Sequence, residues 1–409
     1  MAVGPTGTAL EEPIPVPEEE PRVRAASPAQ WVTQNLFSTW YNAVLTVVFA
    51  AMLSWVTFKV ARFVFVTGRW EIIRVNLATA MLGPFPRGEL YRVWIAVFLL
   101  AAVVGVSVGV SLRAAEGRWS TARRAVPLLA LVVVLLAFTR TPTPLLLTLG
   151  AVAVTAGGWL VGRRLPDTTT RRLPLVWLAV VIGAYAALTA FGGVGWDEWG
   201  GLLLTLFLAV GGIVLSFPLG VLLALGRRSS LPAVRATCTA YIELVRGVPL
   251  ITILLIGATV GFFLPSDLKP SLATRALIAL IAFTAAYLAE IVRGGLQGVA
   301  RGQIEAAQAI GLSPLRTTFL IVLPQALQNV IPAVVGQFIS LFKDTALVKI
   351  IGLTELLSIA QSVNGQPQFS GQGLQAETLV FACFIYWAFC YSMSRASQRL
   401  ERRLEVGER

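Results

Sequence analysis

The stretch Trp199–Gly226 reads WGGLLLTLFLAVGGIVLSFPLGVLLALG and contains no Asp, Glu, Lys or Arg. A helix needs about 20 predominantly apolar residues to cross a bilayer, and this stretch is longer than that. Five more stretches reach this length without a charged residue: Val93–Leu112, Thr141–Gly162, Leu173–Trp196, Gly247–Ser266 and Thr317–Phe342. Because a lipid-exposed backbone must satisfy its own hydrogen bonds, such stretches form helices. The sequence therefore predicts an all-α polytopic membrane protein.

The composition agrees with this fold class. Only 13% of the 409 residues are charged, 56% are apolar, and the mean hydropathy is +0.75. Soluble proteins carry about 25% charged residues. The net charge of +12 comes from basic residues that lie mostly between apolar stretches, where they orient a membrane protein, so we expect a lipid bilayer and no nucleic acid as partner. The chain has no histidine, the commonest general base and metal ligand, and we expect no catalytic and no metal site.

The chain divides into four parts. Residues 1–30 are rich in Pro and Glu, which predicts a disordered cytoplasmic tail. A transmembrane extension follows at 31–195 and ends in a glycine-rich break, and a core at 196–400 precedes a cytoplasmic tail at 401–409. Each side of the break has about five apolar segments, which predicts about ten transmembrane helices. These include a short third segment, Ala125–Thr139, and a seventh at about Gly247–Leu264.

The loop charges predict an orientation. With the N-terminus inside the cell, the basic residues of most loops and of the C-terminal tail are cytoplasmic, as the positive-inside rule requires. We therefore predict that both termini are cytoplasmic. The first external loop is an exception, because it holds Lys59, Arg62, Arg69, Arg74, Arg87 and Arg92. Its apolar residues indicate an interfacial helix around Ile72–Leu82.

One cytoplasmic loop has an unusual local pattern. Ile304–Ile310 is predicted to be a short helix whose first turn carries Glu305, where a negative charge suits the helix dipole. Gly311 fits the left-handed position after a helix end, and Ser313 and Pro314 fit the N-cap and first position of a second helix. The pattern predicts two helices joined by a sharp corner. Capping alone favours an ordinary loop helix over a functional one.

The same segment resembles a known motif. Its spacing, EAA-x3-G-x9-I-x-L-P, is similar in every signature position to the coupling motif of binding-protein-dependent ABC importer permeases. The resemblance implies that the helix at 304–312 inserts into a cleft on a partner ATPase. The implied coupling residues are Ile304, Glu305, Ala306, Ala307, Ile310, Gly311 and Pro324.

Further stretches resemble the polar amino-acid uptake branch of that family over about residues 199–400. They are Tyr241–Leu250 (YIELVRGVPL), Ala286–Gln297 (AYLAEIVRGGLQ) and Ile339–Leu347 (ISLFKDTAL), the last with Ala346 where Ser is usual. The resemblance implies a five-helix permease core in a bacterial plasma membrane. Residues 1–190 resemble the extensions of the long permease subunits of general L-amino-acid importers, which pair two different permeases.

This resemblance also implies the partners. They are an ATPase dimer that binds ATP and Mg, a second homologous permease in a heterodimer, and an extracytoplasmic amino-acid-binding protein. The sequence contains no G-x-x-x-x-G-K-[ST] segment, so we assign ATP hydrolysis to the partner and expect no cofactor in this chain.

Charged residues near the membrane are the other candidates. Glu243 with Arg246, and Glu290 with Arg293, have the i,i+3 spacing that allows pairing on one helix face. Each pair is either a structural tie near the cytoplasmic boundary or a substrate contact.

A second charged group follows the uncharged stretch that ends at Phe342. Lys343 and Asp344 lie at its predicted outer end, and either meet the zwitterion of an amino acid or fix the turn. Lys349 and Glu355 are predicted to face the pore rim or the binding protein.

Two other function classes remain as alternatives. An ion-gradient-driven secondary transporter of amino acids would show inverted repeats and acids within its spans. We find no convincing repeat, and acids within the spans are nearly absent. A membrane-embedded enzyme would need a cluster of nucleophile, base or metal ligands, which the sequence does not offer.

Overall fold

The computed structural model describes residues 27–113, 130–139, 141–166 and 168–405, and these form helices and no strand. The described residues form two units, one that ends at Gly68 and one that begins at Arg69. Within the described residues, eight helices are long and apolar enough to cross a membrane, or nine if one bent pair counts as a span. The predicted terminal tails lie mostly outside the described residues. Of the described tail residues, 28–30 form the start of the first helix and 401–405 form the end of the last helix.

Unit 1 consists of α1 (Pro28–Leu36), α2 (Trp40–Arg62) and a π-helical turn (Phe63–Thr67). Ser27 caps α1 through a capping box with Gln30. Helix α2 is apolar on every side, and none of its residues is buried in the described part of the chain. A helix of this kind is suited to a lipid environment.

Unit 2 begins with helices that belong to the extension. They are α3 (Glu71–Leu82), α4 (Leu90–Arg113), α6 (Pro142–Arg164) and α7 (Thr168–Thr189). Residues 130–137 are also helical, but the beginning of the predicted third segment lies outside the described residues. The described part of that segment is too short to be one of the eight spans.

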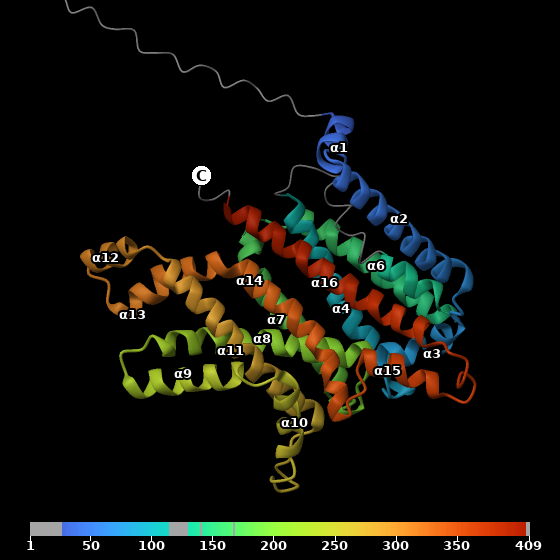
Figure 1. Cartoon of the computed structure of the whole chain (residues 1–409). Coiled ribbons are helices and arrows are strands. Elements are labelled where there is room, and N and C mark those ends of the chain that lie inside the picture. Colours follow the sequence, from blue (N-terminus) through green and yellow to red (C-terminus); the bar gives the residue numbers. More distant parts are fainter. Residues whose placement is uncertain (1–26, 114–129, 140, 167, 406–409) are drawn as a thin grey trace, which may run out of the picture. The chain divides into compact units, whose positions relative to one another are not determined.

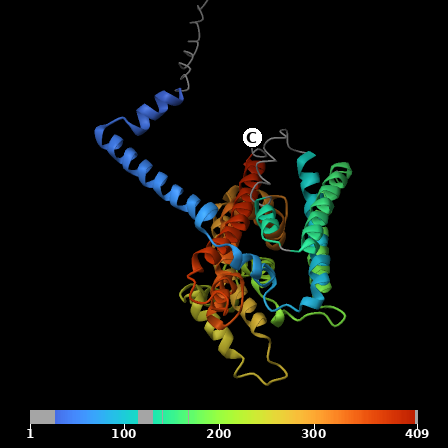
Figure 2. The same ribbon diagram turned by 90° about the vertical axis from the view of Figure 1, so that its right-hand side faces the viewer.

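Helices α4 and α6 pack in direct backbone contact, side by side in Figure 2. Gly105 and Gly109 on α4 face Gly158 and Gly162 on α6, and each helix carries its glycines four residues apart. A Cβ atom on Gly109 would lie 2.8 Å from the Cα of Gly162, closer than real Cβ contacts. This is the small-residue packing by which membrane helices approach closely.

Helix α7 packs on α4 through polar contacts. Trp177 donates a hydrogen bond from Nε1 to Oγ of Ser107 at 2.9 Å. The Arg92 guanidinium donates to the carbonyl oxygens of Ala187 and Ala190 at 3.3 and 2.8 Å. The Ala187 carbonyl lies in the last turn of α7 and the Ala190 carbonyl directly follows it, so Arg92 satisfies groups that a helix end leaves without partners.

The core is built around α11. Its helices are α8 (Gly201–Arg227), α9 (Pro232–Arg246), α10 (Leu250–Val260), α11 (Leu272–Gly298), α12 (Arg301–Ala309), α13 (Pro314–Thr317), α14 (Leu323–Asp344), α15 (Leu356–Ser362) and α16 (Gln375–Glu405). In the most apolar 18-residue stretch of α11, 61% of the residues are buried, a larger share than in any other described span. Figure 1 shows α12 and α13 at one end of this unit and α3 and α15 at the other. We call these the α12 end and the α15 end.

The predicted seventh segment differs from expectation. It forms α10, which ends at Val260 and follows α9 across a bend of 107°. The bend falls at Gly247–Pro249, where proline removes a backbone donor and disfavours a helical conformation for the residue before it. The stretch is therefore half of a bent element and not a complete span.

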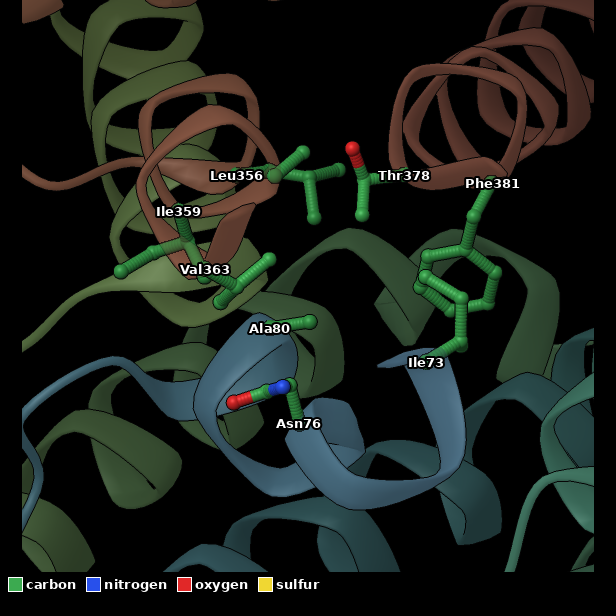
Figure 3. A pocket seen from close by; sticks show the side chains of 9 residues that line it. Ile73, Asn76, Ala80, Leu356, Ile359, Val363, Thr378 and Phe381 are labelled. Carbon is green, nitrogen blue, oxygen red and sulfur yellow. The ribbon is translucent and has the colours of Figure 1, made fainter. Parts of the chain in front are cut away.

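Helix α3 covers the α15 end of the core. The predicted helix around Ile72–Leu82 is present, but Ile72 and Ile73 are buried against protein rather than a membrane interface. In Figure 3, Asn76 and Ala80 of α3 face residues of α15 and α16 across a small cavity of about 10 Å³. The side-chain amides of Asn76 and Gln366 exchange two hydrogen bonds, at 3.2 and 2.7 Å. The extension and the core thus share one hydrophobic cluster.

Candidate functional site

The predicted short helix lies at the α12 end, with revised bounds. It begins after Ala300, so Glu305 lies in its middle and not in its first turn, which corrects the prediction. The extended backbone of Ala300 separates it from α11, and no side chain caps its start. Ala307 is buried, Ile304 is half-buried, and Glu305 is exposed. Most of α12 therefore presents its surface away from this chain.

The corner after α12 has the predicted form. Gly311 has φ +82°, the left-handed region that favours glycine. The amide of Leu312 donates to the carbonyl of Ala307 at 3.1 Å, the long hydrogen bond of a Schellman motif. Ser313 then caps α13 through the amide of Arg316. Two short helices are thereby fixed at an angle without bulky side chains.

The corner leads into a span through a widened turn. Residues Thr318–Val322 form a π-helical turn, and the amide of Leu323 donates to the carbonyl of Thr318. Pro324 follows at once, and its ring would clash with the carbonyl four residues earlier in a regular helix. The π turn removes that clash. Pro324 therefore shapes the start of α14 and does not belong to the corner itself.

A network of five charged residues joins α8, α9 and α11. Arg227 binds Glu243 at 2.8 Å and Glu290 at 2.5 Å. Glu290 also binds Arg293 at 2.8 Å and lies 3.6 Å from Arg246. The predicted Glu290–Arg293 pair is confirmed. The predicted pairing of Glu243 with Arg246 is wrong, because each of them has a partner on a neighbouring helix.

The charged residues at the end of α14 and in the turn after it are at least partly exposed, whereas Glu355 is buried. Lys343 is exposed and Asp344 is half-buried at the end of the helix. A 3-10 turn follows, Thr345–Ile351, in which Lys349 is exposed. The 3-10 turn contacts α15, so these positions belong to the α15 end.

Glu355 does not face a pore rim, contrary to the prediction. It is fully buried, and its carboxylate accepts hydrogen bonds from the amides of Leu357 and Ser358, both at 2.6 Å, and from the Tyr386 hydroxyl at 3.1 Å. Burial raises the pKa of the Glu355 carboxyl, and these hydrogen bonds oppose the shift only in part. Glu355 caps α15 and ties it to α16.

Comparison with known proteins agrees with this arrangement. Residues 216–406 match the family of binding-protein-dependent transport system inner membrane components. The chain is 34% identical over 398 residues to the inner membrane amino-acid ABC transporter permease protein YhdY of Escherichia coli, covering 92% of this chain and 93% of the relative.

The chain belongs to this family of ABC transporter permeases.

Two further relatives match parts of the permease. The glutamate/glutamine/aspartate/asparagine transport system permease protein BztC of Rhodobacter capsulatus is 44% identical over 214 residues, 52% of this chain and 49% of BztC. The probable glutamine ABC transporter permease protein GlnP of Bacillus subtilis is 40% identical over 207 residues, 50% of this chain and 92% of GlnP. Because the matched half of this chain corresponds to 92% of GlnP, GlnP has no extension as long as the other half of this chain.

Sequence reasoning missed Arg227 as a member of the charged network. Arg227 is the first charged residue after the uncharged stretch of α8, and it looked like an ordinary loop charge. Its partners Glu243 and Glu290 lie on two other helices of the permease. Only the mutual packing of α8, α9 and α11 reveals the connection.

Proposed function

We propose that this permease is the membrane-spanning subunit of an ATP-driven, binding-protein-dependent importer of amino acids. The relatives named above are amino-acid permeases, and their names support this class of substrate. The chain is an inner-membrane protein with several spans. We further propose that both termini are cytoplasmic, which places the α12 end inside the cell and the α15 end outside.

The observation that carries this proposal is the exposed corner at the α12 end. Ile310 is 77% exposed and Leu315 is 70% exposed, although both are apolar. Apolar side chains in an exposed, rigid corner are suited to burial against another protein. The partner is an ATPase dimer that binds ATP and Mg. The corner inserts into a cleft on this dimer. The contact residues are Ile304, Glu305, Ala306, Ile310 and Gly311. Ala307, predicted as a coupling residue, is buried and packs α12 onto its own chain, and Pro324 shapes the helix behind the corner.

Motion at the corner has a direct route into the core. Helix α12 follows α11 after two residues, and α13 continues through the π turn into α14. The Gln325 amide donates to the Gln303 side chain at 3.3 Å, which ties α12 to α14 a second time. A pull on α12 therefore acts on α11 and α14 together, and these two helices pack on each other along the core.

The pathway lies along this core, with a second, homologous permease supplying the other half. Helix α14 is part of an apolar span, yet Asn329 and Gly336 on it are exposed. A polar residue on a membrane helix favours a protein or water-filled neighbour over lipid. Lys343 and Asp344 mark the outer end of this route, where an extracytoplasmic binding protein delivers the amino acid. The core comprises residues 196–400, and residues 31–195 are the extension.

Site-specific cross-linking tests the proposal. The three native cysteines, Cys238, Cys383 and Cys390, are replaced by Ser, and one cysteine is introduced by Ile310→Cys. The tagged chain is purified from its native membrane, cross-linked, and assayed for Mg-dependent ATP hydrolysis. We expect the corner cysteine to cross-link to a co-purified ATPase. A control cysteine, Ser230→Cys in the turn between α8 and α9, should give much less product.

Two results would contradict the proposal. One is the absence of an ATPase from the purified complex, and the other is equal cross-linking at the two positions. Uptake of a panel of labelled amino acids into vesicles that contain all partner chains then identifies the substrate.

A further inference from the structure

Helix α9 is the least embedded long helix of the core. Ile242 is its only buried residue within the described chain, and most of its first half is exposed. It begins after a short turn that follows α8, and it ends at the 107° bend around Gly247–Pro249. Glycine next to a proline-directed bend gives the backbone room to change direction. An element with so little buried surface and a bend at its end is suited to movement.

Polar contacts supply much of what holds α9 in place. The Tyr241 hydroxyl donates to the carbonyl of Ala282 on α11 at 2.8 Å. The carboxylate of Glu243 and the guanidinium of Arg246 join the charged network on the same side. Arg246 also lies over the ring of Tyr287, at 5.6 Å from its centroid. All of these contacts lie near the end of α9, close to the bend.

Arg227 occupies the central position in this network. It is the only member that contacts an acid on α9 and an acid on α11 at the same time, within the described residues. Its side chain is 23% exposed, that of Glu290 is 15% exposed and that of Glu243 is 56% exposed. Ion pairs that retain contact with water are exchanged for hydration at small cost, which distinguishes them from a packed apolar contact. The network therefore suits a contact that forms and breaks.

We propose that Arg227 is a positioning residue of the transport cycle: it holds α9 against α8 and α11, and α9 leaves both helices when these ion pairs part. The proposal rests on the transport function proposed above. Arg227 acts through Glu243 and Glu290 and does not need to contact the transported molecule. Helix α9 is then the element that moves at the α12 end of the core.

A reversible cross-link between α8 and α9 tests this movement. A Cβ atom placed on Gly226 would lie 3.5 Å from the Cβ of Cys238, within the range that a disulfide spans, and so close to the Cys238 Sγ that this side chain must rotate to form the bond. The variant Gly226→Cys is made in a chain with Cys383→Ser and Cys390→Ser, and the complete complex is placed in vesicles. Oxidation should reduce amino-acid uptake at least tenfold, and a reductant should restore it. The matched control, Gly226→Ser, should not respond to oxidation.

Two outcomes of this experiment would overturn the inference. If a fully cross-linked complex takes up amino acids as fast as the same complex treated with reductant, α9 does not leave α8. Failure of the two thiols to cross-link would remove the arrangement from which the inference starts. In either case an ATPase that still co-purifies with the chain leaves the proposed function standing, whereas loss of the ATPase from the wild-type complex counts against that function.

A second variant tests Arg227 without a cross-link. Arg227→Gln should raise ATP hydrolysis in the absence of the binding protein at least threefold, because α9 is no longer held. Arg227→Lys keeps the charge and should restore most of the wild-type coupling. The control is Arg228→Gln, since Arg228 donates only to the carbonyl of Leu296 within the described contacts. Equal behaviour of the two Gln variants would contradict the role of Arg227.

Discussion

Replacing Gly311 by Ala isolates the contribution of the left-handed corner. No heavy atom lies within 4 Å of a Cβ placed on Gly311, so the substitution causes no clash. The cost is that of the backbone alone, because φ is +82°. An L-residue in the left-handed region costs roughly 1–2 kcal/mol. Since 1.4 kcal/mol is a factor of ten, the corner should form about 5 to 30 times less readily.

The assay is the number of amino-acid molecules imported per ATP hydrolysed, in vesicles that contain all partner chains. This ratio should fall for Gly311→Ala while the amount of the chain in the membrane stays unchanged. The matched control is Gly302→Ala, because Gly302 lies in α12 itself, also has no atom within 4 Å of its Cβ position, and has no positive φ. Gly311→Asn should be milder, since Asn tolerates the left-handed region. A coupling ratio that is the same for Gly311→Ala and Gly302→Ala would refute the reasoning.

Three further predictions concern the extension and the α15 end. Gly109→Leu should prevent α4 and α6 from meeting and lower the thermal stability of the purified chain, with Gly157→Leu as a control because Gly157 faces open space. Glu355→Gln should lower stability by about 1–3 kcal/mol in thermal unfolding of the detergent-solubilised complex, because one amide that now donates to the carboxylate loses its acceptor; an unchanged midpoint would contradict the capping role. Asp344→Asn should lower uptake without loss of assembly, because Asp344 lies at the outer end of the proposed pathway; normal uptake would contradict this placement and favour the turn-fixing role.

The sequence predicted the features that depend on local chemistry. Uncharged stretches located most of the spans, because a bilayer imposes their length directly. The corner at Gly311 and the cap at Ser313 were also predicted, since both follow from the conformational preferences of single residues. The π turn before Pro324 was not predicted, although proline signals a disturbance there. Its form depends on how the helix resolves the clash.

Features that depend on packing between distant segments could not be predicted. The partner of Glu243 lies 16 residues away on α8, and Arg227 reaches Glu290 across a separation of 63 residues. The i,i+3 spacing predicted that Glu243 pairs with Arg246, because spacing describes only neighbours on the same helix face. Glu355 illustrates the same limit, since an acidic residue in a loop was expected at the surface. It is instead buried and accepts a hydrogen bond from Tyr386, which follows 31 residues later.

Three of the six basic residues in the predicted first external loop, Arg69, Arg87 and Arg92, have structural partners and count less against the proposed orientation. The Arg69 guanidinium donates to the backbone and side chain of Gln372, and Arg87 donates to the hydroxyl of Thr79 at 3.0 Å. Arg92 is bound to carbonyls at the end of α7. The positive-inside rule describes loop charges that act on chain insertion. Guanidinium groups that serve as donors within the fold have a structural reason to be where they are, so this loop is a weaker guide to orientation than the later ones.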